Sequence, residues 1–154
     1  AVGADDVAVL PYSSGTTGLA KGVVLTHRNL VANLCQVEPV FDVDPGRKLL
    51  AVLPFFHIYG MTVMMNNGLH NRATVVTMPR MDLPEFLRII AEHQVDFVYI
   101  APPVAVALAK HPIVDQFDLS CIDTVFSGAA PRSTPSWATP WRSGWAARCC
   151  RGTA

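Results

Sequence analysis

The sequence has little charge and no excess of either sign. Lys and Arg together number 12, as do Asp and Glu, and only 16% of the 154 residues are charged. This balance gives no electrostatic reason to expect nucleic acid or an anionic membrane surface as a partner. Because 51% of the residues are hydrophobic, the composition excludes a disordered chain and suits one folded domain.

Cysteine is scarce, and long uninterrupted apolar runs are absent. The four cysteines lack the spacing of a metal site or a disulfide framework, so we expect a reducing, cytoplasmic location. The longest apolar stretch, 95–109, contains Asp96 and a Pro-Pro pair, which disfavours a membrane-spanning helix. No signal peptide is evident. Because the chain opens with Ala1 and not with Met, we expect a piece of a longer protein.

Short apolar segments alternate along the chain with segments of helical periodicity. We expect strands over 7–12, 23–25, 49–53, 73–78, 95–100 and 122–126, the first of them buried. We expect helices over 26–37, 56–69, 83–93 and 103–110. The alternation predicts an α/β fold with βαβ units and a mainly parallel sheet that is covered on both faces.

Ligands of such sheets bind at the carboxyl ends of the strands. The segments that follow Tyr12, Leu53 and Phe126 are expected at those ends. These segments also contain the residues that are most informative about function, among them the Ser- and Gly-rich run after Tyr12 and His57. The sequence therefore predicts a site where the three segments meet.

The segment 13–22, SSGTTGLAKG, is predicted to be an irregular loop. Its glycines allow sharp turns and a close approach to a ligand, while its hydroxyl groups and the ammonium of Lys21 suit polyphosphate oxygens. It is not a Walker A loop, because the GxxxxGK[ST] spacing is absent and Gly22 follows Lys21. From composition alone, a flexible Ser/Gly linker is the alternative.

Three motifs together resemble the signature of the adenylate-forming superfamily, which contains acyl-CoA synthetases, luciferases and adenylation domains. They are YSSGTTGLAKG at 12–22, LPFFHIYG at 53–60 and SGAAP at 127–131. Their order and spacing, together with APP at 101–103, are most similar to 4-coumarate–CoA ligase-like enzymes. The resemblance implies that 1–131 is a fragment of the large N-terminal domain of an AMP-forming ligase that uses ATP, Mg²⁺ and CoA.

The resemblance also implies roles for individual residues. Those that would hold the ATP phosphates are Ser13, Ser14, Gly15, Thr16, Thr17, Gly18 and Lys21. His57 would lie beside the acyl carboxylate and, with Lys21, serve catalysis. Tyr59 would line the acyl pocket, whose floor would be formed by Ser127, Gly128, Ala129, Ala130 and Pro131. No metal ligand is assigned. Taken alone, a histidine beside aromatic residues is more often a core residue, and a core aromatic in a helix is the alternative for Tyr59.

The implied reaction activates a carboxylic acid, aryl or fatty, as acyl-AMP and then transfers it to CoA. The acidic magnesium ligand, the ribose-binding Asp and the C-terminal lid of the family are not found in the sequence, so the fragment itself is expected to be inactive. Two alternatives stay open: a non-functional truncated product, and an adenylation domain that loads a carrier protein.

The segment 132–154 differs in composition from everything before it. All three tryptophans lie there, together with several arginines and no acidic residue. Written in GC-rich codons and read from the third base, the segment becomes VDAELGDAVAERLGCPLLQGYG, an amphipathic helix, a short strand and a Gly-Tyr-Gly turn. We therefore interpret 132–154 as an out-of-frame tail, with a genuine Trp/Arg-rich interaction tail as the alternative.

We predict that the coding DNA contains an insertion or deletion near the codons for Pro131 and Arg132. Resequencing the locus and its transcript tests this prediction. An intact reading frame through a natural stop codon after Ala154 would contradict it.

Overall fold

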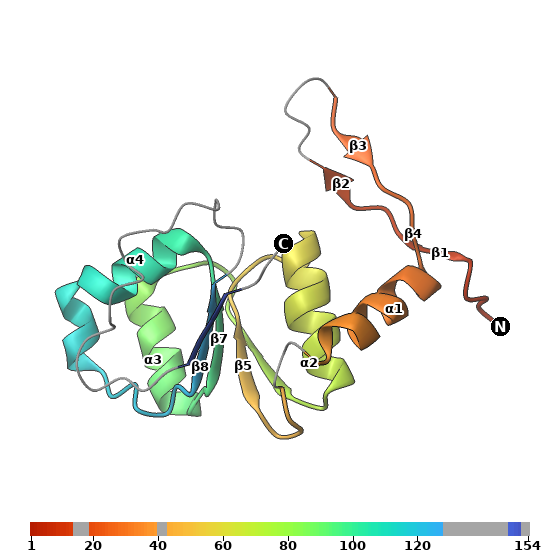
Figure 1. The fold of residues 1–154 in the computed structure, drawn as a ribbon. Coiled ribbons are helices and arrows are strands. Elements are labelled where there is room, and N and C mark those ends of the chain that lie inside the picture. Colours follow the sequence, from red (N-terminus) through yellow and green to blue (C-terminus); the bar gives the residue numbers. More distant parts are fainter. Residues whose placement is uncertain (14–18, 40–42, 128–147, 152–154) are drawn as a thin grey trace.

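The computed structural model describes residues 1–13, 19–39, 43–127 and the backbone of 148–151. Its centre is a five-stranded sheet with the order β6-β5-β7-β8-β9 (Figure 1). The strands are β5 (Lys48–Ala51), β6 (Thr74–Thr77), β7 (Phe97–Ile100), β8 (Thr124–Ser127) and β9 (Arg148–Arg151). Every neighbouring pair is parallel, which confirms the expected α/β class.

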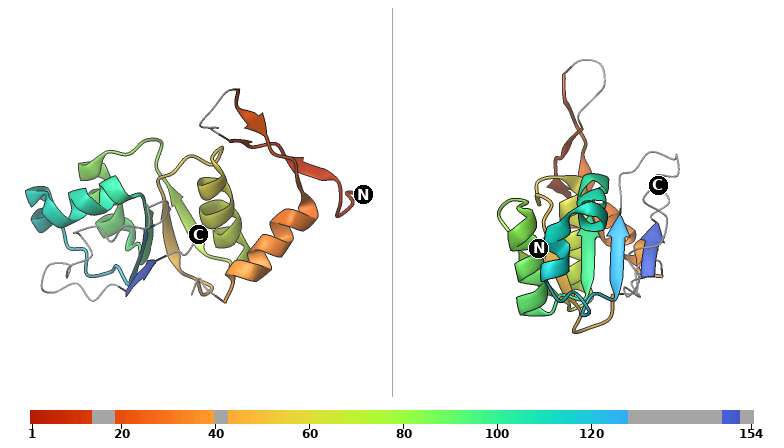
Figure 2. Two further views of the ribbon diagram at one scale, coloured as in Figure 1. Left: turned by 45° about the horizontal axis from the view of Figure 1, so that its top comes forward. Right: turned by 90° about the vertical axis from the view of Figure 1, so that its left-hand side faces the viewer.

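Helices cover both faces of the sheet. The helices α3 (Leu83–His93) and α4 (Pro102–Lys110) lie on one face, followed by the 3₁₀ helix η2 (Pro112–Gln116), as Figures 1 and 2 show. The π-helix η1 (Tyr59–Asn66) continues into α2 (Asn67–His70) on the other face. The expected helix at 56–69 is therefore confirmed, although it begins at Tyr59 and its first part is π-helical.

Side chains alternate between two buried clusters, as the two-residue period of a strand requires. Along β7, Val98 and Ile100 pack in the cluster with α3 and α4. Phe97 and Tyr99 pack in the opposite cluster, with Met64 of η1. All four residues of β7 are at most 1% exposed. This two-sided burial explains why the strand is apolar throughout instead of alternating.

An ion-pair cluster fixes the amino ends of three strands. The guanidinium of Arg47, just before β5, lies 2.7 Å from Asp123 Oδ2, just before β8, and 3.6 Å from Asp96 Oδ1, just before β7. Asp96 also accepts a 3.3 Å hydrogen bond from the backbone N–H of Lys48. The Arg47 side chain is only 16% exposed. The cluster therefore aligns β5, β7 and β8 at one edge of the sheet.

The helix α1 (His27–Val37) begins where the sequence predicts, at a capping box. Thr26 Oγ1 accepts from the backbone N–H of Asn29 at 3.2 Å, and Asn29 Oδ1 accepts from the N–H of Thr26 at 3.0 Å. This reciprocal pair satisfies two amide groups that a helix start leaves unpaired. None of the residues of α1 is buried, so the cap and not core packing defines where this helix starts.

The N-terminal strands differ from the expectation. β1 (Val7–Val9) pairs antiparallel with β4 (Leu25–Thr26), and β2 (Tyr12–Ser13) pairs antiparallel with β3 (Lys21–Gly22). The prediction of a buried strand over 7–12 was wrong, because these strands pair with each other instead of entering the sheet, and Val7 stays 55% exposed. The prediction that 13–22 contains no regular structure was wrong for Ser13, which lies in β2, and for Lys21 and Gly22, which form β3.

Two further points complete the fold. The segment after β5 and Ser127, the last residue of β8, lie at the carboxyl ends of the parallel sheet, as expected. Ser13, directly after Tyr12, belongs to the β2–β3 hairpin and not to that sheet. In the ranges that the structure describes, no helix is both long and apolar enough to cross a membrane. Of the tail interpreted as out of frame, 132–147 and 152–154 lie outside the described residues.

We predict that Gly68→Val destabilises the fold. Gly68 is buried in α2, and even a single added Cβ would lie 2.8 Å from both Leu49 Cδ1 and Val75 Cγ2. Overpacking of this kind costs about 1–3 kcal/mol of unfolding free energy. Urea denaturation of the chain measures the effect. The control is Leu69→Val at the next position, which is 64% exposed and should change stability by less than about 0.5 kcal/mol. Equal stabilities of the two variants would contradict the packing described.

Candidate functional site

The glycine-rich segment is closed at its base by the β2–β3 hairpin. Ser13 lies opposite Lys21 in the register, and Ser13 Oγ donates to the Lys21 carbonyl oxygen at 3.4 Å. Both side chains are exposed, and among the described residues the Lys21 ammonium has no ion-pair partner. Five predicted phosphate-binding residues lie outside the described residues: Ser14, Gly15, Thr16, Thr17 and Gly18. The hairpin thus places one hydroxyl, from Ser13, and one ammonium, from Lys21, at the base of the glycine-rich segment.

His57 lies in the turn between β5 and η1. The backbone N–H of His57 donates to the Pro54 carbonyl oxygen at 3.1 Å, and the backbone carbonyl of His57 accepts from the Met61 N–H at 2.9 Å. The ring nitrogen Nδ1 accepts from the backbone N–H of Tyr59 at 3.2 Å. In a neutral imidazole, the nitrogen that accepts cannot be the one that donates. Neutral His57 therefore has its proton on Nε2, and its exposed ring can donate a hydrogen bond to an oxygen anion.

Gly60 allows the turn to close against the first residues of the helix. A Cβ at position 60 would lie 2.2 Å from the carbonyl oxygen of Pro54 and 3.0 Å from that of Leu53. Only a residue without a side chain fits this approach without a shift of the backbone. The start of η1 therefore packs directly on the backbone of Leu53 and Pro54, which follow β5.

An aromatic cluster lies behind His57, at the carboxyl ends of β7 and β8. The rings of Tyr59 and Tyr99 have centroids 6.5 Å apart in an edge-to-face arrangement, and Tyr99 and Phe126 are 5.7 Å apart. Such pairs prefer this geometry because the ring edge is positive and the ring face negative. Tyr99 and Phe126 are buried, so Tyr59, which is partly exposed, is the ring of this cluster that could contact an aryl or alkyl group.

Tyr99 is the polar member of this cluster that lies deepest. It is completely buried, and its hydroxyl lies 3.3 Å from Nδ2 of Asn67, which is itself buried. Burial disfavours the phenolate and raises the pKa of Tyr99 to about 12, although the hydrogen bond from Asn67 opposes the rise. At neutral pH the group is a neutral hydroxyl.

Ser127 is the last residue of β8 and pairs in register with Ile100 of β7. It is 9% exposed, and its Oγ has no hydrogen-bond partner among the described residues. A buried hydroxyl without a partner is costly, so this oxygen is available to a group from outside them. The other predicted floor residues lie outside the described part of the chain: Gly128, Ala129, Ala130 and Pro131.

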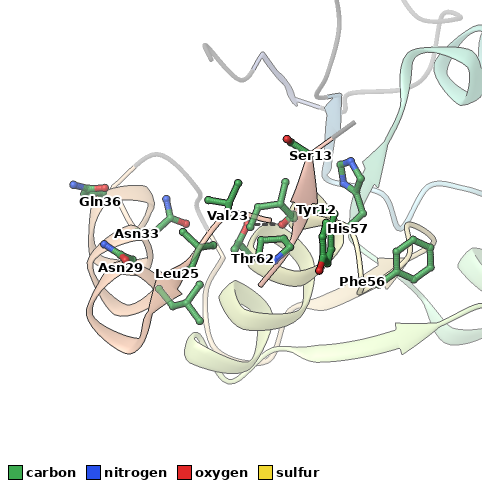
Figure 3. Close-up of a pocket in the computed structure, with 13 residues that line it drawn as sticks. Tyr12, Ser13, Val23, Leu25, Asn29, Asn33, Gln36, Phe56, His57 and Thr62 are labelled. Carbon is green, nitrogen blue, oxygen red and sulfur yellow. Dashed lines mark hydrogen bonds between the residues drawn. The ribbon is translucent and has the colours of Figure 1, made fainter. Parts of the chain in front are cut away.

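Some of the predicted residues come together around one pocket with a volume of about 760 Å³. Ser13 from β2 and His57 both line it, and they lie at the same end of it in Figure 3. Lys21 is paired with Ser13 across the hairpin but does not itself line the pocket. Tyr59 and Ser127 do not line it either, because their side chains belong to the aromatic cluster and the strand end behind it.

The sequence analysis missed the contribution of α1. Asn29, Asn33 and Gln36 line the end of the pocket that lies opposite His57. Their spacing of four and three residues places them on one face of a helix, so this signal was present in the sequence. Nothing in the sequence indicated that this face turns toward His57, which lies more than twenty residues away along the chain.

Comparison with known proteins gives three informative matches and one family. The AMP-binding enzyme family matches residues 1–146. The 4-coumarate–CoA ligase-like 9 of Oryza sativa subsp. japonica is 48% identical over 132 residues, which is 82% of this chain and 23% of the relative. The chain thus spans about a quarter of the length of the curated relatives that it matches.

Solved structures agree with this assignment. The inhibitor-bound N-terminal domain of FACL13 from Mycobacterium tuberculosis superimposes with a TM-score of 0.88 and 26% identity, over 100% of this chain and 38% of that chain. ATP-bound MatB from Rhodopseudomonas palustris superimposes with a TM-score of 0.74 and 30% identity, over 84% of this chain and 25% of that one. The fold of the described residues is therefore shared with the N-terminal domain of FACL13 and with MatB.

We predict that Tyr99 makes stability depend on alkaline pH. Because the folded-state pKa of Tyr99 is raised to about 12 while an unfolded tyrosine ionises near pH 10, the stabilisation is complete below about pH 10 and is lost as the pH rises toward 12. Tyr99→Phe should lower the free energy of unfolding by about 1 kcal/mol at neutral pH, because a hydrogen bond is lost. The difference in unfolding free energy between the parent chain and the variant should become smaller between pH 10 and 12.

Urea denaturation at several pH values measures this gap. Tyr12→Phe, which removes a hydroxyl from a ring that is 73% exposed, is the matched control. A gap between parent and Tyr99→Phe that stays constant up to pH 12 would show that the hydroxyl is not held neutral by burial.

Proposed function

Because the chain belongs to the AMP-binding enzyme family, we propose that the protein to which it contributes activates a carboxylic acid with ATP and transfers the acyl group to CoA. The observation that supports this proposal is the shared pocket of Ser13 and His57. A hydroxyl beside the glycine-rich segment and an imidazole N–H thereby face one space in which a phosphate and a carboxylate could meet.

Both steps of the proposed reaction are displacements. In the first, a carboxylate oxygen of the acid forms a bond to the α-phosphorus of ATP, and the bond to pyrophosphate breaks. In the second, the sulfur of CoA bonds to the acyl carbon, its thiol proton is lost, and AMP leaves with the electron pair. Such chemistry needs positioning and charge neutralisation more than covalent catalysis by the protein.

The described residues can supply these functions. Lys21 is exposed on the hairpin, and its ammonium would neutralise the β- and γ-phosphate oxygens, with Ser13 and the glycine-rich segment as hydrogen-bond donors. The Nε2–H of His57 would donate to the carboxylate or to an adenylate oxygen where charge develops. Mg²⁺ would enter with ATP and add positive charge at the phosphates, and we assign it no ligand in this chain.

The aromatic cluster favours an apolar acyl group. Tyr59 is partly exposed and packs edge-to-face on the buried rings of Tyr99 and Phe126, and its ring suits an aryl acid first and a medium-chain fatty acid second. The relative in Oryza sativa is named a 4-coumarate–CoA ligase-like protein, and this supports the same order. The free thiols Cys35 and Cys121 agree with work in a reducing compartment such as the cytoplasm.

We predict that Lys21→Ala impairs the first step more than the second. Removing a charged hydrogen-bond partner costs about 1.5–3 kcal/mol, or about tenfold to a hundredfold in rate, in ATP-dependent adenylate formation. Thioester formation from synthetic acyl-AMP and CoA should suffer less, because the β- and γ-phosphates have already left. The measurement compares both half-reactions in the full-length protein with its reading frame restored.

Lys110→Ala is the control for this experiment, since Lys110 is exposed at the end of α4 and lies outside the pocket. It should leave both half-reactions unchanged. If Lys21→Ala damaged the two half-reactions equally, Lys21 would support the fold and not the phosphates. If acyl-AMP reacted with a carrier-protein thiol and not with CoA, the acceptor in the proposal would be wrong.

A further inference from the structure

The peptide group that joins Ile58 to Tyr59, at the start of η1, is held by hydrogen bonds at both of its polar atoms. Its N–H donates to Nδ1 of His57 at 3.2 Å. Its carbonyl oxygen accepts from the hydroxyl of Thr62, four residues after Ile58, at 2.7 Å. The side chain of Thr62 therefore acts on the same planar group that orients the imidazole ring.

The acceptor that Thr62 uses distinguishes it from other helical threonines. A threonine hydroxyl that donates to the carbonyl four residues before it is common in helices. The carbonyl of Ile58, however, belongs to the amide whose N–H reaches the ring of His57. Because a peptide group is planar, its N–H turns when its carbonyl oxygen turns. Thr62 therefore fixes the direction of this N–H toward Nδ1.

The hydrogen bonds from Thr62 to His57 all run in one direction. The Thr62 hydroxyl donates to the amide, the amide donates to Nδ1, and the neutral ring of His57 then has Nε2–H as its donor. Hydrogen bonds in such a chain polarise one another, so the first bond strengthens the donors that follow it. Loss of the Thr62 hydroxyl should therefore weaken the preference of His57 for a proton on Nε2.

Thr62 also lines the pocket beside His57 (Figure 3). Because its hydroxyl proton is used in the bond to the Ile58 carbonyl, its oxygen offers lone pairs and not a donor to the pocket. A phosphate or carboxylate oxygen needs a donor. The observed bond thus favours a role of Thr62 behind His57 over direct contact with an anion.

We propose that Thr62 is a positioning residue, which holds the Ile58–Tyr59 amide so that Nε2 remains the protonated nitrogen of His57. This role rests on the proposed function, in which the Nε2–H of His57 donates to a carboxylate or adenylate oxygen. Thr62 lies outside the motif LPFFHIYG at 53–60, and the hydrogen bond to Ile58 connects it with the site.

The test measures the tautomer of His57 directly, without ATP, acid or CoA. In the chain labelled with ¹⁵N in its histidines, long-range ¹H–¹⁵N NMR correlations at about pH 8.5, where an ordinary histidine is neutral, distinguish a proton on Nε2 from one on Nδ1. His57→Gln identifies the signals of His57. We expect the Nε2–H tautomer to predominate in the parent chain. In Thr62→Val the ratio of Nε2–H to Nδ1–H should fall about twofold to tenfold, as the loss of one neutral hydrogen bond predicts.

Two further variants of Thr62 separate the hydrogen bond from packing. Thr62→Ser keeps the hydroxyl and should keep the parent ratio, whereas Thr62→Ala, with a higher helix propensity, should show the same fall as Thr62→Val. Circular dichroism verifies that each variant is folded. Thr77→Val, at an exposed position of β6, is the matched control and should leave the ratio unchanged. An unchanged ratio in Thr62→Val and Thr62→Ala, or an equal fall in Thr62→Ser, would overturn the inference.

Kinetics of the full-length protein with its reading frame restored give a second measurement. Thr62→Val should lower kcat of adenylate formation by about the same twofold to tenfold and leave the KM for ATP unchanged, because Ser13 and Lys21 are untouched. A higher KM with an unchanged kcat would mean that Thr62 contacts a substrate directly, which contradicts the positioning role.

The outcome is separable from that of the proposed function because the tautomer is measured without substrates. If the ratio falls as expected but the parent protein forms no acyl-AMP, the proposed reaction fails and the positioning of His57 by Thr62 stands. If acyl-AMP forms but the ratio is the same with and without the Thr62 hydroxyl, the positioning role fails and the reaction stands.

Discussion

The alignment of three parallel strands is the constraint on which the rest of the described structure depends. Arg47 draws Asp96 and Asp123 to one point at the amino ends of β5, β7 and β8, and the ladder hydrogen bonds then fix the register residue by residue. Because strands of similar length that begin level also end level, the turn after β5 and Ser127 at the end of β8 both lie at the opposite edge of the sheet. The Arg47 side chain is only 16% exposed, so the loss of a carboxylate partner would leave a positive charge that water compensates only in part.

The N-terminal arm formed by β1 to β4 has a different physical basis. It does not join the sheet, its strands are two or three residues long, and residues such as Val7 and Leu10 remain more than half exposed. Its geometry comes from local terms: the pairing of Ser13 with Lys21, and the capping box that starts α1 directly after β4. The pocket thus forms where a locally determined arm passes a turn that the core has fixed, and Figure 3 shows residues of both parts around it.

Hydrogen bonding determines what each polar group of the site can do. The backbone N–H of Tyr59 occupies Nδ1 of His57, which leaves Nε2 as a donor when the ring is neutral. Burial raises the pKa of Tyr99 to about 12 beside Asn67, so the aromatic cluster stays uncharged into the alkaline range. The pocket therefore has the hydrogen-bond donor of His57 at one end and the amides of α1 at the other. The part of its lining that the structure describes contains no acidic side chain.

The sequence by itself determined the α/β class, the boundaries of α3 and the strand at Phe97–Ile100, because strong periodicity and capping residues such as Asp82 act locally. Glycine spacing and hydroxyl content also pointed to the loop with Lys21, whereas the roles of His57 and Tyr59 came from the family resemblance alone and stay predictions. Only the tertiary structure decided that the strand at Val7–Val9 lies outside the sheet and that the amide face of α1 turns toward His57. Both depend on contacts between segments far apart in sequence, and local propensity contains no information about such contacts.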